Sequence, residues 1–440
     1  MLCKYELVLS NHYKLIFTLI YILKNYYLYS VNYIMNINAL NSPSFRLYLF
    51  GSFIALNGLW IQRIIIGWLS WEITNSPFYV GIAAFLSLAP TIFSGPVFGV
   101  LIDRVNIRVA FFLSYSSMIL CSTILYVLIL TNLLSIQSLL LICLFIGVIA
   151  SAAHPIRMSL APRLIEEYQV PSLVALTAVN FNTTRLIGPA IGGFLIQYFG
   201  ASQAVLISIF TYMPVMFFIL FIKPRDLVLS GKNKSFIFDF FEGIKLIFSN
   251  SIIKFSIVLS GLTSFVGRGV LETLPLISEG IFQQGPSGLG LITATAGAGA
   301  LFASITKALG KAETMGTNIP DSILFTALTI PLTVLLIGYV DTFYEALFLI
   351  FILGFLATTI GISIQSKIQL ELKDIFRGRV MSIWIMINMG SAALGSILFG
   401  MISDYSNIQF THILFGYTFI ILIVFLISVN KIRKEIKIES

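Results

Sequence analysis

The chain has 440 residues, of which 58% are hydrophobic and only 10% are charged, with a mean hydropathy of +0.95. Soluble domains carry about 25% charged residues, so this composition excludes an ordinary soluble protein. The formal net charge of +8 is compatible with a nucleic-acid partner, but the placement of the basic residues along the chain argues against one and for a lipid bilayer.

Long apolar runs separated by short polar segments predict an all-α membrane protein with about twelve transmembrane helices, because one span needs ~20 mostly apolar residues. The predicted spans are 46–70, 79–101, 107–131, 136–156, 173–199, 201–222, 252–277, 287–308, 321–340, 343–367, 379–402 and 408–430.

Three segments lie outside these spans. Residues 1–45 are predicted to be an N-terminal extension, of which 1–34 either precede the native start at Met35 or form a helix on the membrane surface. Residues 223–251 are predicted to be a cytoplasmic linker with an amphipathic helix over 235–248, and residues 431–440 a basic cytoplasmic tail.

The basic residues predict the orientation. Of the 27 Lys and Arg, three (Arg63, Arg185 and Arg268) lie deep within spans. The other 24 lie at span ends or in connections that fall on one side, if the end near residue 46 is cytoplasmic and the helices alternate. This is the positive-inside pattern. We therefore expect a multi-pass protein of the cell inner membrane with both termini in the cytoplasm.

The two halves of the chain repeat each other. Arg63, Gly81, Gly188 and Gly193 recur at nearly one offset as Arg268, Gly288, Gly395 and Gly400. The repeat predicts two six-helix bundles, 46–222 and 252–430, related by an axis along the membrane normal. Transporters built in this way bind substrate near the midplane between the repeats.

Charged side chains within the spans are the main candidates for a site, because an arginine at the bilayer centre costs ~2.5–3.5 kcal/mol on insertion scales. Glu272 follows Arg268 by one helical turn and is expected to pair with it. Arg63 and Arg185 lack an acidic neighbour in sequence, so we expect polar side chains, water or an anionic substrate group as their partners. The predicted cavity residues are Gln62, Arg63, Asn180, Asn182, Arg185, Arg268 and Glu272, with Glu272 as the proton-binding group.

Two further sets of residues are predicted to move or close the protein. Charged turns at 99–108 and 371–382 are expected to meet across the halves as a cytoplasmic gate, with Asp103 paired to Arg377, Arg379 or a helix N-terminus. The charged residues expected to form this gate are Asp103, Arg104, Arg108, Arg377 and Arg379. The second set is expected to give one helix a flat face for close packing and a point at which it can bend: Gly188, Pro189, Gly192 and Gly193.

Three scattered Cys and three scattered His predict no disulfide framework, metal site or cofactor.

The segments GLWIQRIIIGWLSWEITNSPFYVG, GPVFGVLIDR, HPIRMSLAPRLI, NFNTTRLIGPAIGG and FRGRVMS, in this order, resemble the major facilitator superfamily, in the branch of the enterobactin exporter and related drug-efflux proteins. The resemblance implies that Gly99, Asp103, Arg104 and Arg108 carry the gating motif of the superfamily, which adds Gly99 to the gating residues. It also implies that Gly188, Pro189, Gly192 and Gly193 carry its antiporter motif. Asn106, Ile107 and Thr184 depart from these motifs.

Together these features predict a proton-coupled exporter of small amphipathic molecules, such as drugs or siderophores, that works by alternating access as a monomer. Its partners are then the substrate, protons and the lipid bilayer. A facilitator or importer on the same fold is the alternative. A membrane-embedded enzyme is a remote one, because the sequence has no paired catalytic carboxylates or nucleophile–base pair at a bilayer edge.

Overall fold

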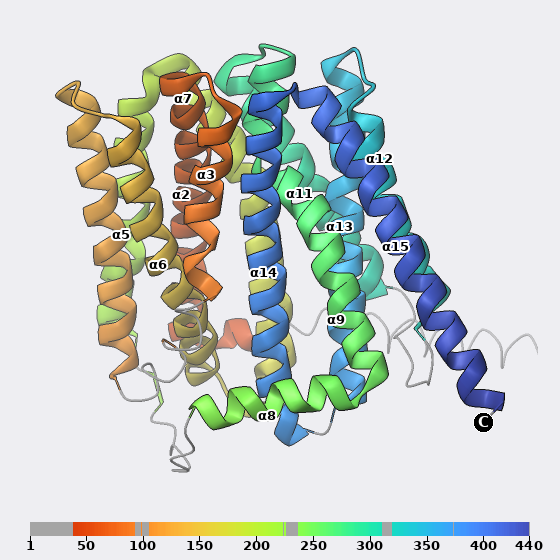
Figure 1. Cartoon of the computed structure of the whole chain (residues 1–440). Helices are drawn as coiled ribbons and strands as arrows, with labels where there is room; N and C mark the ends of the chain where they lie inside the picture. Colours follow the sequence, from red (N-terminus) through yellow and green to blue (C-terminus); the bar gives the residue numbers. More distant parts are fainter. Residues whose placement is uncertain are drawn as a thin grey trace, which may run out of the picture.

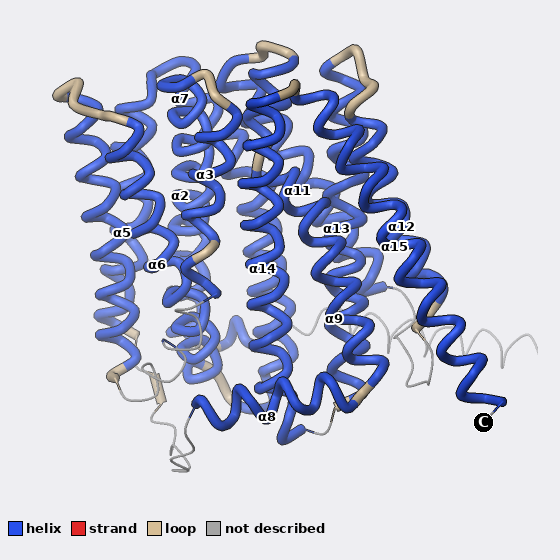
Figure 2. Tube along the Cα trace, viewed as in Figure 1, coloured by secondary structure: helices blue, strands red, loops and turns tan. Residues whose placement is uncertain are grey.

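The computed structural model describes residues 38–92, 98, 105–222, 224–225, 236–309, 319–372 and 374–439. These ranges are helical throughout, joined by short turns (Figures 1 and 2). The α-helices are α2 (Pro43–Thr74), α3 (Pro77–Leu88), α5 (Ile107–Leu130), α6 (Ile136–Leu160), α7 (Val170–Phe221), α8 (Phe236–Ser249), α9 (Ser251–Thr263), α10 (Gly269–Glu272), α11 (Gly285–Leu309), α12 (Asp321–Ile337), α13 (Phe343–Glu371), α14 (Asp374–Tyr405) and α15 (Ile408–Glu439).

Short helical turns complete the chain. The 3-10 turns are η1 (Asn38–Asn41), η2 (Ala161–Leu164) and η3 (Glu167–Gln169), and two π segments, η4 (Ser264–Arg268) and η5 (Leu276–Ile281), flank α10. Mid-span π segments are rare and occur often at functional sites. Here η4 ends at one of the predicted cavity arginines.

Within the described ranges, nine helical stretches are long and apolar enough to cross a membrane, and Pro77–Ile92 and Asp321–Ile337 are shorter apolar helices. The longest helix, α7, contains Gly200 with φ 84° and ψ 164°. Only glycine adopts this backbone conformation without strain, so the helix breaks there and the chain reverses. The break confirms the predicted boundary between residues 199 and 201.

The first long helix begins earlier than predicted, and the residues before it are packed. Ser42 caps α2 by accepting a hydrogen bond from the Phe45 N–H, and Pro43 takes the first helical position. Ala39 is fully buried, and its N–H donates to the Ser172 hydroxyl at 3.2 Å. Residues 38–45 therefore belong to the folded protein, and their assignment to an extension was wrong.

The amphipathic α8 lies across one end of the other helices (Figure 1). We call this end the α8 side and the opposite end the far side, where α2 joins α3 and α5 joins α6. One face of α8 packs inward through Gly243 and Ile247, whereas Phe241 and Phe248 are 62% and 69% exposed. The helix predicted over 235–248 is confirmed almost to the residue.

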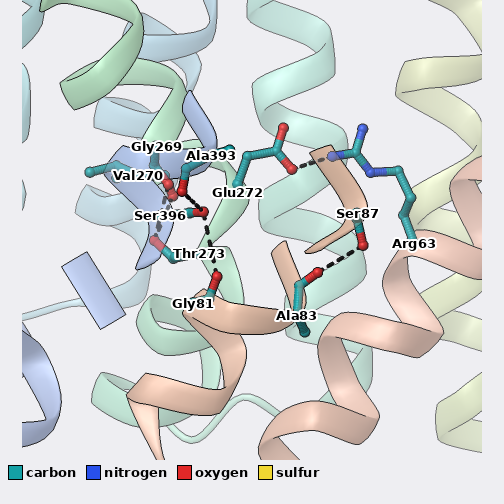
Figure 3. A network of polar contacts seen from close by, with 10 residues as sticks. All are labelled: Arg63, Gly81, Ala83, Ser87, Gly269, Val270, Glu272, Thr273, Ala393 and Ser396. Carbon is teal, nitrogen blue, oxygen red and sulfur yellow. Dashed lines mark hydrogen bonds and ion pairs between the residues drawn. The ribbon is translucent and has the colours of Figure 1, made fainter. Parts of the chain in front are cut away.

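On the far side, α3 from the first half of the chain contacts α14 from the second. A Cβ built on Gly400 would lie 2.5 Å from the Pro77 carbonyl oxygen and 3.0 Å from the Gly81 Cα. The Ser396 hydroxyl also reaches the Gly81 carbonyl, at 3.5 Å (Figure 3). The two backbones are therefore in direct contact, which small residues permit.

The second contact between the halves joins α7 to α11 with the same geometry. A Cβ built on Gly193 would lie 2.5 Å from the Pro286 carbonyl oxygen and 2.7 Å from the Gly290 Cα. In both contacts a proline in the first turn of a helix and a glycine one turn later receive a glycine of the other half. The residue of the second half that takes the place of Gly81 is thus Gly290, and the predicted equivalent, Gly288, was wrong.

Candidate functional site

A cavity of about 1180 Å³ lies between the two halves of the chain. Its walls come from α2, α3, α6 and α7 of the first half and from η4, α10, α11, α13 and α14 of the second, with Phe240 of α8 at one end. Aliphatic and aromatic side chains form much of the wall, and a small number of charged and polar groups project from it. This combination is typical of binding sites for small organic molecules.

An ion pair crosses the cavity from one half to the other. The Arg63 guanidinium of α2 donates to the Glu272 carboxylate of α10 (Figure 3). The guanidinium also lies over the Trp60 ring, with its central carbon 5.1 Å from the ring centroid. The Arg63 side chain is 36% exposed and that of Glu272 is 22% exposed, both at the cavity wall.

The predicted pairing of Glu272 with Arg268 was wrong, as was the expectation that Arg63 has no carboxylate partner. Arg268 is the last residue of the π segment η4, and the residues that follow it, Gly269–Glu272, form the α-helical turn α10. The spacing of four residues permits a pair within this turn, but the Glu272 carboxylate is bound by the Arg63 guanidinium of the other half. A spacing rule within one helix does not include partners from another element.

Two more arginines line the same part of the cavity. Arg185, in the middle of α7, is within electrostatic range of Arg268, Arg63 and Glu272. Neither Arg185 nor Arg268 makes a hydrogen bond or an ion pair with any residue that the structure describes. Three guanidinium groups thus share one carboxylate here, and this region carries an excess of positive charge.

The three predicted amides differ in their positions. Gln62 is among the residues that line the cavity. It is 1% exposed, donates to the Ser122 hydroxyl at 2.9 Å and accepts from the Tyr212 hydroxyl at 2.7 Å, so it also joins α2, α5 and α7. Asn180 and Asn182 are not part of the cavity wall. The Asn180 amide is buried against the Leu49 carbonyl at 3.4 Å, and the Asn182 amide donates to the Ala178 carbonyl of its own helix at 2.9 Å.

Charged residues also line the α8 side of the cavity. Arg157 lies in the last turn of α6, and Arg379 lies near the start of α14 and pairs with Glu242 of α8. Sequence reasoning missed Arg157 as a cavity residue, although it lies in HPIRMSL at the end of an apolar run. The sequence analysis considered only arginines near the predicted midplane, and Arg157 lies just beyond the end of the predicted span 136–156.

The predicted gate is only partly visible. Gly99, Asp103 and Arg104 lie outside the described residues. The Arg108 N–H donates to the Asn106 side chain at 3.0 Å, which caps α5, and the Arg377 side chain donates to the Gln369 carbonyl at 3.1 Å. The carboxylate found against Arg379 is Glu242, which the sequence analysis did not connect to it.

The glycine-rich face of α7 lies between two helices. A Cβ on Gly188 would come within 2.6 Å of the Trp60 Cβ, and one on Gly192 within 3.2 Å of the Ile61 Cα, both on α2. On the other side of α7, the Pro189 carbonyl and Gly193 approach Gly290 of α11. Gly188 and Gly192 therefore pack within the first half, and Pro189 and Gly193 make the contact between the halves.

A helical membrane protein with a charged cavity between two repeated halves has the architecture of a solute transporter. The family model for the transmembrane secretion effector matches residues 35–439. The chain belongs to this family, within the major facilitator superfamily, which confirms the resemblance seen in the sequence and identifies a transporter rather than an enzyme.

Among curated proteins, the chain is 24% identical over 404 residues to the staphyloferrin A transporter of Staphylococcus aureus (strain NCTC 8325 / PS 47), covering 88% of this chain and 96% of that protein. A mutant of the nucleoside transporter NupG superposes with a TM-score of 0.70 at 11% identity, covering 88% of this chain and 99% of that one. The human organic anion transporter MFSD10 (TETRAN) gives a TM-score of 0.62 at 15% identity, covering 87% and 99%. A bacterial homologue of the human lysosomal transporter Spinster, in an inward-facing and unoccupied conformation, gives 0.62 at 12% identity, covering 88% and 95%. These solved structures share the fold with this chain.

Proposed function

We propose that this protein is a proton-coupled exporter of small amphipathic organic molecules that carry anionic groups. Residues 46–222 and 252–430 act as two six-helix bundles that rock about the central cavity. The protein lies in the cell inner membrane with α8 and both termini in the cytoplasm, and it functions as a monomer.

The observation that carries the proposal is the charged cavity between the halves, bridged by Arg63 and Glu272. The backbone contacts at Gly400 and Gly193 support closure on the far side, and the reach of the cavity to Phe240 of α8 supports opening toward α8. With the positive-inside orientation, this is an inward-facing state. Alternating access requires the converse state, in which the far-side contacts separate.

The charges of the cavity support an anionic substrate. Arg63, Arg157, Arg185, Arg268 and Arg379 line it, and Glu272 is the carboxylate among its described lining residues. Guanidinium groups bind carboxylates and phosphates through paired hydrogen bonds.

The S. aureus relative is named for staphyloferrin A, which favours siderophores over the other substrate classes predicted from the sequence.

The position of Glu272 supports proton coupling. Its carboxylate lies in a partly buried part of the cavity wall and pairs with Arg63 of the other half. Its protonation removes the ion pair with Arg63, and an anionic substrate that binds Arg63 competes with it in the same way. Proton uptake and substrate release then both change the contact between the halves. The glycine-rich face of α7 gives the moving helices a close, polar-free surface.

The test uses everted membrane vesicles with an imposed pH gradient and a dye that reports it. A panel of catecholate siderophores, carboxylate-bearing macrocycles, macrolides and lipophilic cations is added to wild type and to Glu272→Gln. We expect one anionic class to collapse the gradient in wild type and not in Glu272→Gln. Glu72→Gln is the matched control, because Glu72 is exposed on α2 and does not line the cavity.

A facilitator or importer on the same fold remains the second candidate, since the repeat and the cavity serve either direction. Substrate movement that continues at the same rate without a proton gradient, and that is unchanged in Glu272→Gln, would favour it. Loss of the gradient response with every class of the panel would overturn proton-coupled export of those classes.

A further inference from the structure

Two arginines from opposite halves line the cavity on the α8 side. Arg157 comes from the last turn of α6 and Arg379 from the first turns of α14 (Figure 1). Both lie near helix ends at the α8 side, whereas Arg185 of the central group lies midway between the start of α7 and its break at Gly200. The cavity therefore contains cationic groups at two levels.

The two arginines differ in their contacts. The Arg157 side chain makes no hydrogen bond or ion pair with the residues that the structure describes. Arg379 pairs with Glu242 of α8, and its guanidinium lies over the Phe376 ring at 5.6 Å. The Arg379 side chain is 14% exposed and that of Glu242 is 34% exposed, so the carboxylate is the more accessible member of the pair.

The position of Glu242 is set by packing around it. Gly243 lies against α14, where a Cβ would meet the Ile383 side chain at 2.9 Å and the Arg379 carbonyl at 3.3 Å. Ile247, one turn further along α8, is also buried. This packing holds α8 on α14 independently of the ion pair, so the carboxylate can leave Arg379 without release of the helix.

We infer that Arg157 and Arg379 form a second anion-binding subsite at the α8 side of the cavity. In the absence of a ligand, the Glu242 carboxylate pairs with the Arg379 guanidinium. The carboxylate, sulfonate or phosphate group of a small organic anion displaces Glu242 from this pair. The inference rests on the proposed function, because it describes where that substrate first binds. The Glu242 carboxylate and a substrate oxyanion would compete for the same N–H donors of the Arg379 guanidinium. After displacement, the central arginines bind the solute next.

The subsite can be tested without a known substrate by measuring the reactivity of one cysteine in it. Ser382 lines the cavity one turn after Arg379, and its hydroxyl donates to the Arg379 carbonyl at 2.8 Å. Ser382→Cys is introduced into the full chain after Cys3, Cys121 and Cys143 are replaced by serine. The detergent-solubilised protein is then treated with methanethiosulfonate reagents that carry either a sulfonate or a trimethylammonium group.

We expect the sulfonate reagent to react faster than the cationic one at this position. Arg157→Gln and Arg379→Gln should each lower the ratio of the two rates about threefold or more, and Glu242→Gln should raise it by a similar factor, because one unit charge is removed close to the thiol. Lys245→Gln, an exposed change on the same helix, should leave the ratio unchanged. A cysteine at Thr131, on the far side, should show none of these effects and controls for general differences between the reagents.

A protection experiment tests binding itself. Benzoate should slow the reaction of Ser382→Cys with uncharged methyl methanethiosulfonate, whereas benzyl alcohol should not, and the protection should be stronger in Glu242→Gln. Arg157→Lys and Arg379→Lys, which keep the charge, should retain part of it and show that loss in the Gln variants is not misfolding.

Equal rate ratios in all variants would overturn the subsite. Loss of anion preference in the arginine variants with no change in Glu242→Gln would overturn the displacement by Glu242. These results are independent of transport: an anion-selective subsite in a protein that moves no substrate in vesicles would refute the proposed export and leave the subsite intact.

Discussion

Gly193 of α7 and Gly290 of α11 touch through their backbones: a Cβ built on Gly193 would lie 2.7 Å from the Gly290 Cα, and one built on Gly290 would lie 2.9 Å from the Gly193 Cα. No larger residue at either position preserves this contact without a shift of one helix. Since the contact joins the two halves next to the cavity, the sizes of these two residues bear on which conformation the transporter adopts.

Gly193→Ala should therefore destabilise the state that is closed on the far side. The new methyl group would meet the Pro286 carbonyl at 2.5 Å as well as Gly290. We expect transport to fall about tenfold, since a shift of about 1.4 kcal/mol in a two-state equilibrium changes the populations by that factor. A cysteine in place of Ser87, which lines the cavity, should react faster with an impermeant reagent added on the far side.

The control for this prediction is Gly361→Ala on α13, because nothing lies within 4 Å of a Cβ built there. It should leave transport and the reactivity of the Ser87 cysteine unchanged. If Gly193→Ala behaves like Gly361→Ala, the contact between α7 and α11 does not govern closure.

Ser76 and Asp404 provide a direct lock on the same side. The Ser76 hydroxyl at the start of α3 donates to the Asp404 carboxylate at the end of α14, at 2.6 Å. We expect cysteines at both positions to form a disulfide under mild oxidation, to stop transport, and to restore it after reduction. The cross-link is measured by mobility on a gel after cleavage in the 226–235 segment. The pair Ser76→Cys with Ser135→Cys should not cross-link, and inhibition by that pair would show that the effect is not specific.

Replacing one member of the Arg63–Glu272 pair should lower stability more than replacing both. Arg63→Gln or Glu272→Gln alone leaves one charge without its partner, which we expect to lower stability by about 1–3 kcal/mol, below the 3–5 kcal/mol of a fully buried pair. The smaller figure reflects side chains that are 36% and 22% exposed. The double variant should recover part of this loss, measured by thermal unfolding in detergent.

Arg225 and Glu166 offer the matched surface pair, with N and O atoms 2.7 Å apart and side chains 47% and 61% exposed. Breaking it should cost less than about 1 kcal/mol. A loss at Arg225→Gln as large as at Arg63→Gln would mean that the inter-half pair has no special role in stability.

The parts of this protein that local sequence determines were predictable. Nine helical stretches within the described ranges are long and apolar enough to specify a span, and the reversal at Gly200 follows from a glycine between two apolar runs. The helix α8 was predictable because its apolar and charged residues alternate at helical spacing.

The contacts within the site were not predictable in the same way. Arg63 and Glu272 are far apart in sequence and meet only after the halves assemble, so no local spacing rule connects them. The choice of Arg268 as the partner considered only residues of the same helix, whereas the carboxylate pairs with Arg63 of the other half. Gly288 was matched to Gly81 by offset alone, whereas packing selects Gly290 because it follows Pro286 as Gly81 follows Pro77.

A substitution at Tyr212 tests whether the hydrogen bonds of Gln62 serve stability or transport. Its hydroxyl, in a side chain that is 1% exposed, donates to Gln62 at 2.7 Å, and Gln62 donates to Ser122. Tyr212→Phe leaves the buried Gln62 carbonyl oxygen without this donor, which should cost about 1–3 kcal/mol. We expect a lower unfolding temperature in detergent with unchanged transport per folded molecule. Tyr198→Phe, at a side chain that is 69% exposed, should change neither quantity. If Tyr212→Phe instead impaired transport at full stability, Gln62, which lines the cavity, would act in the substrate path as well as in the packing between α2, α5 and α7.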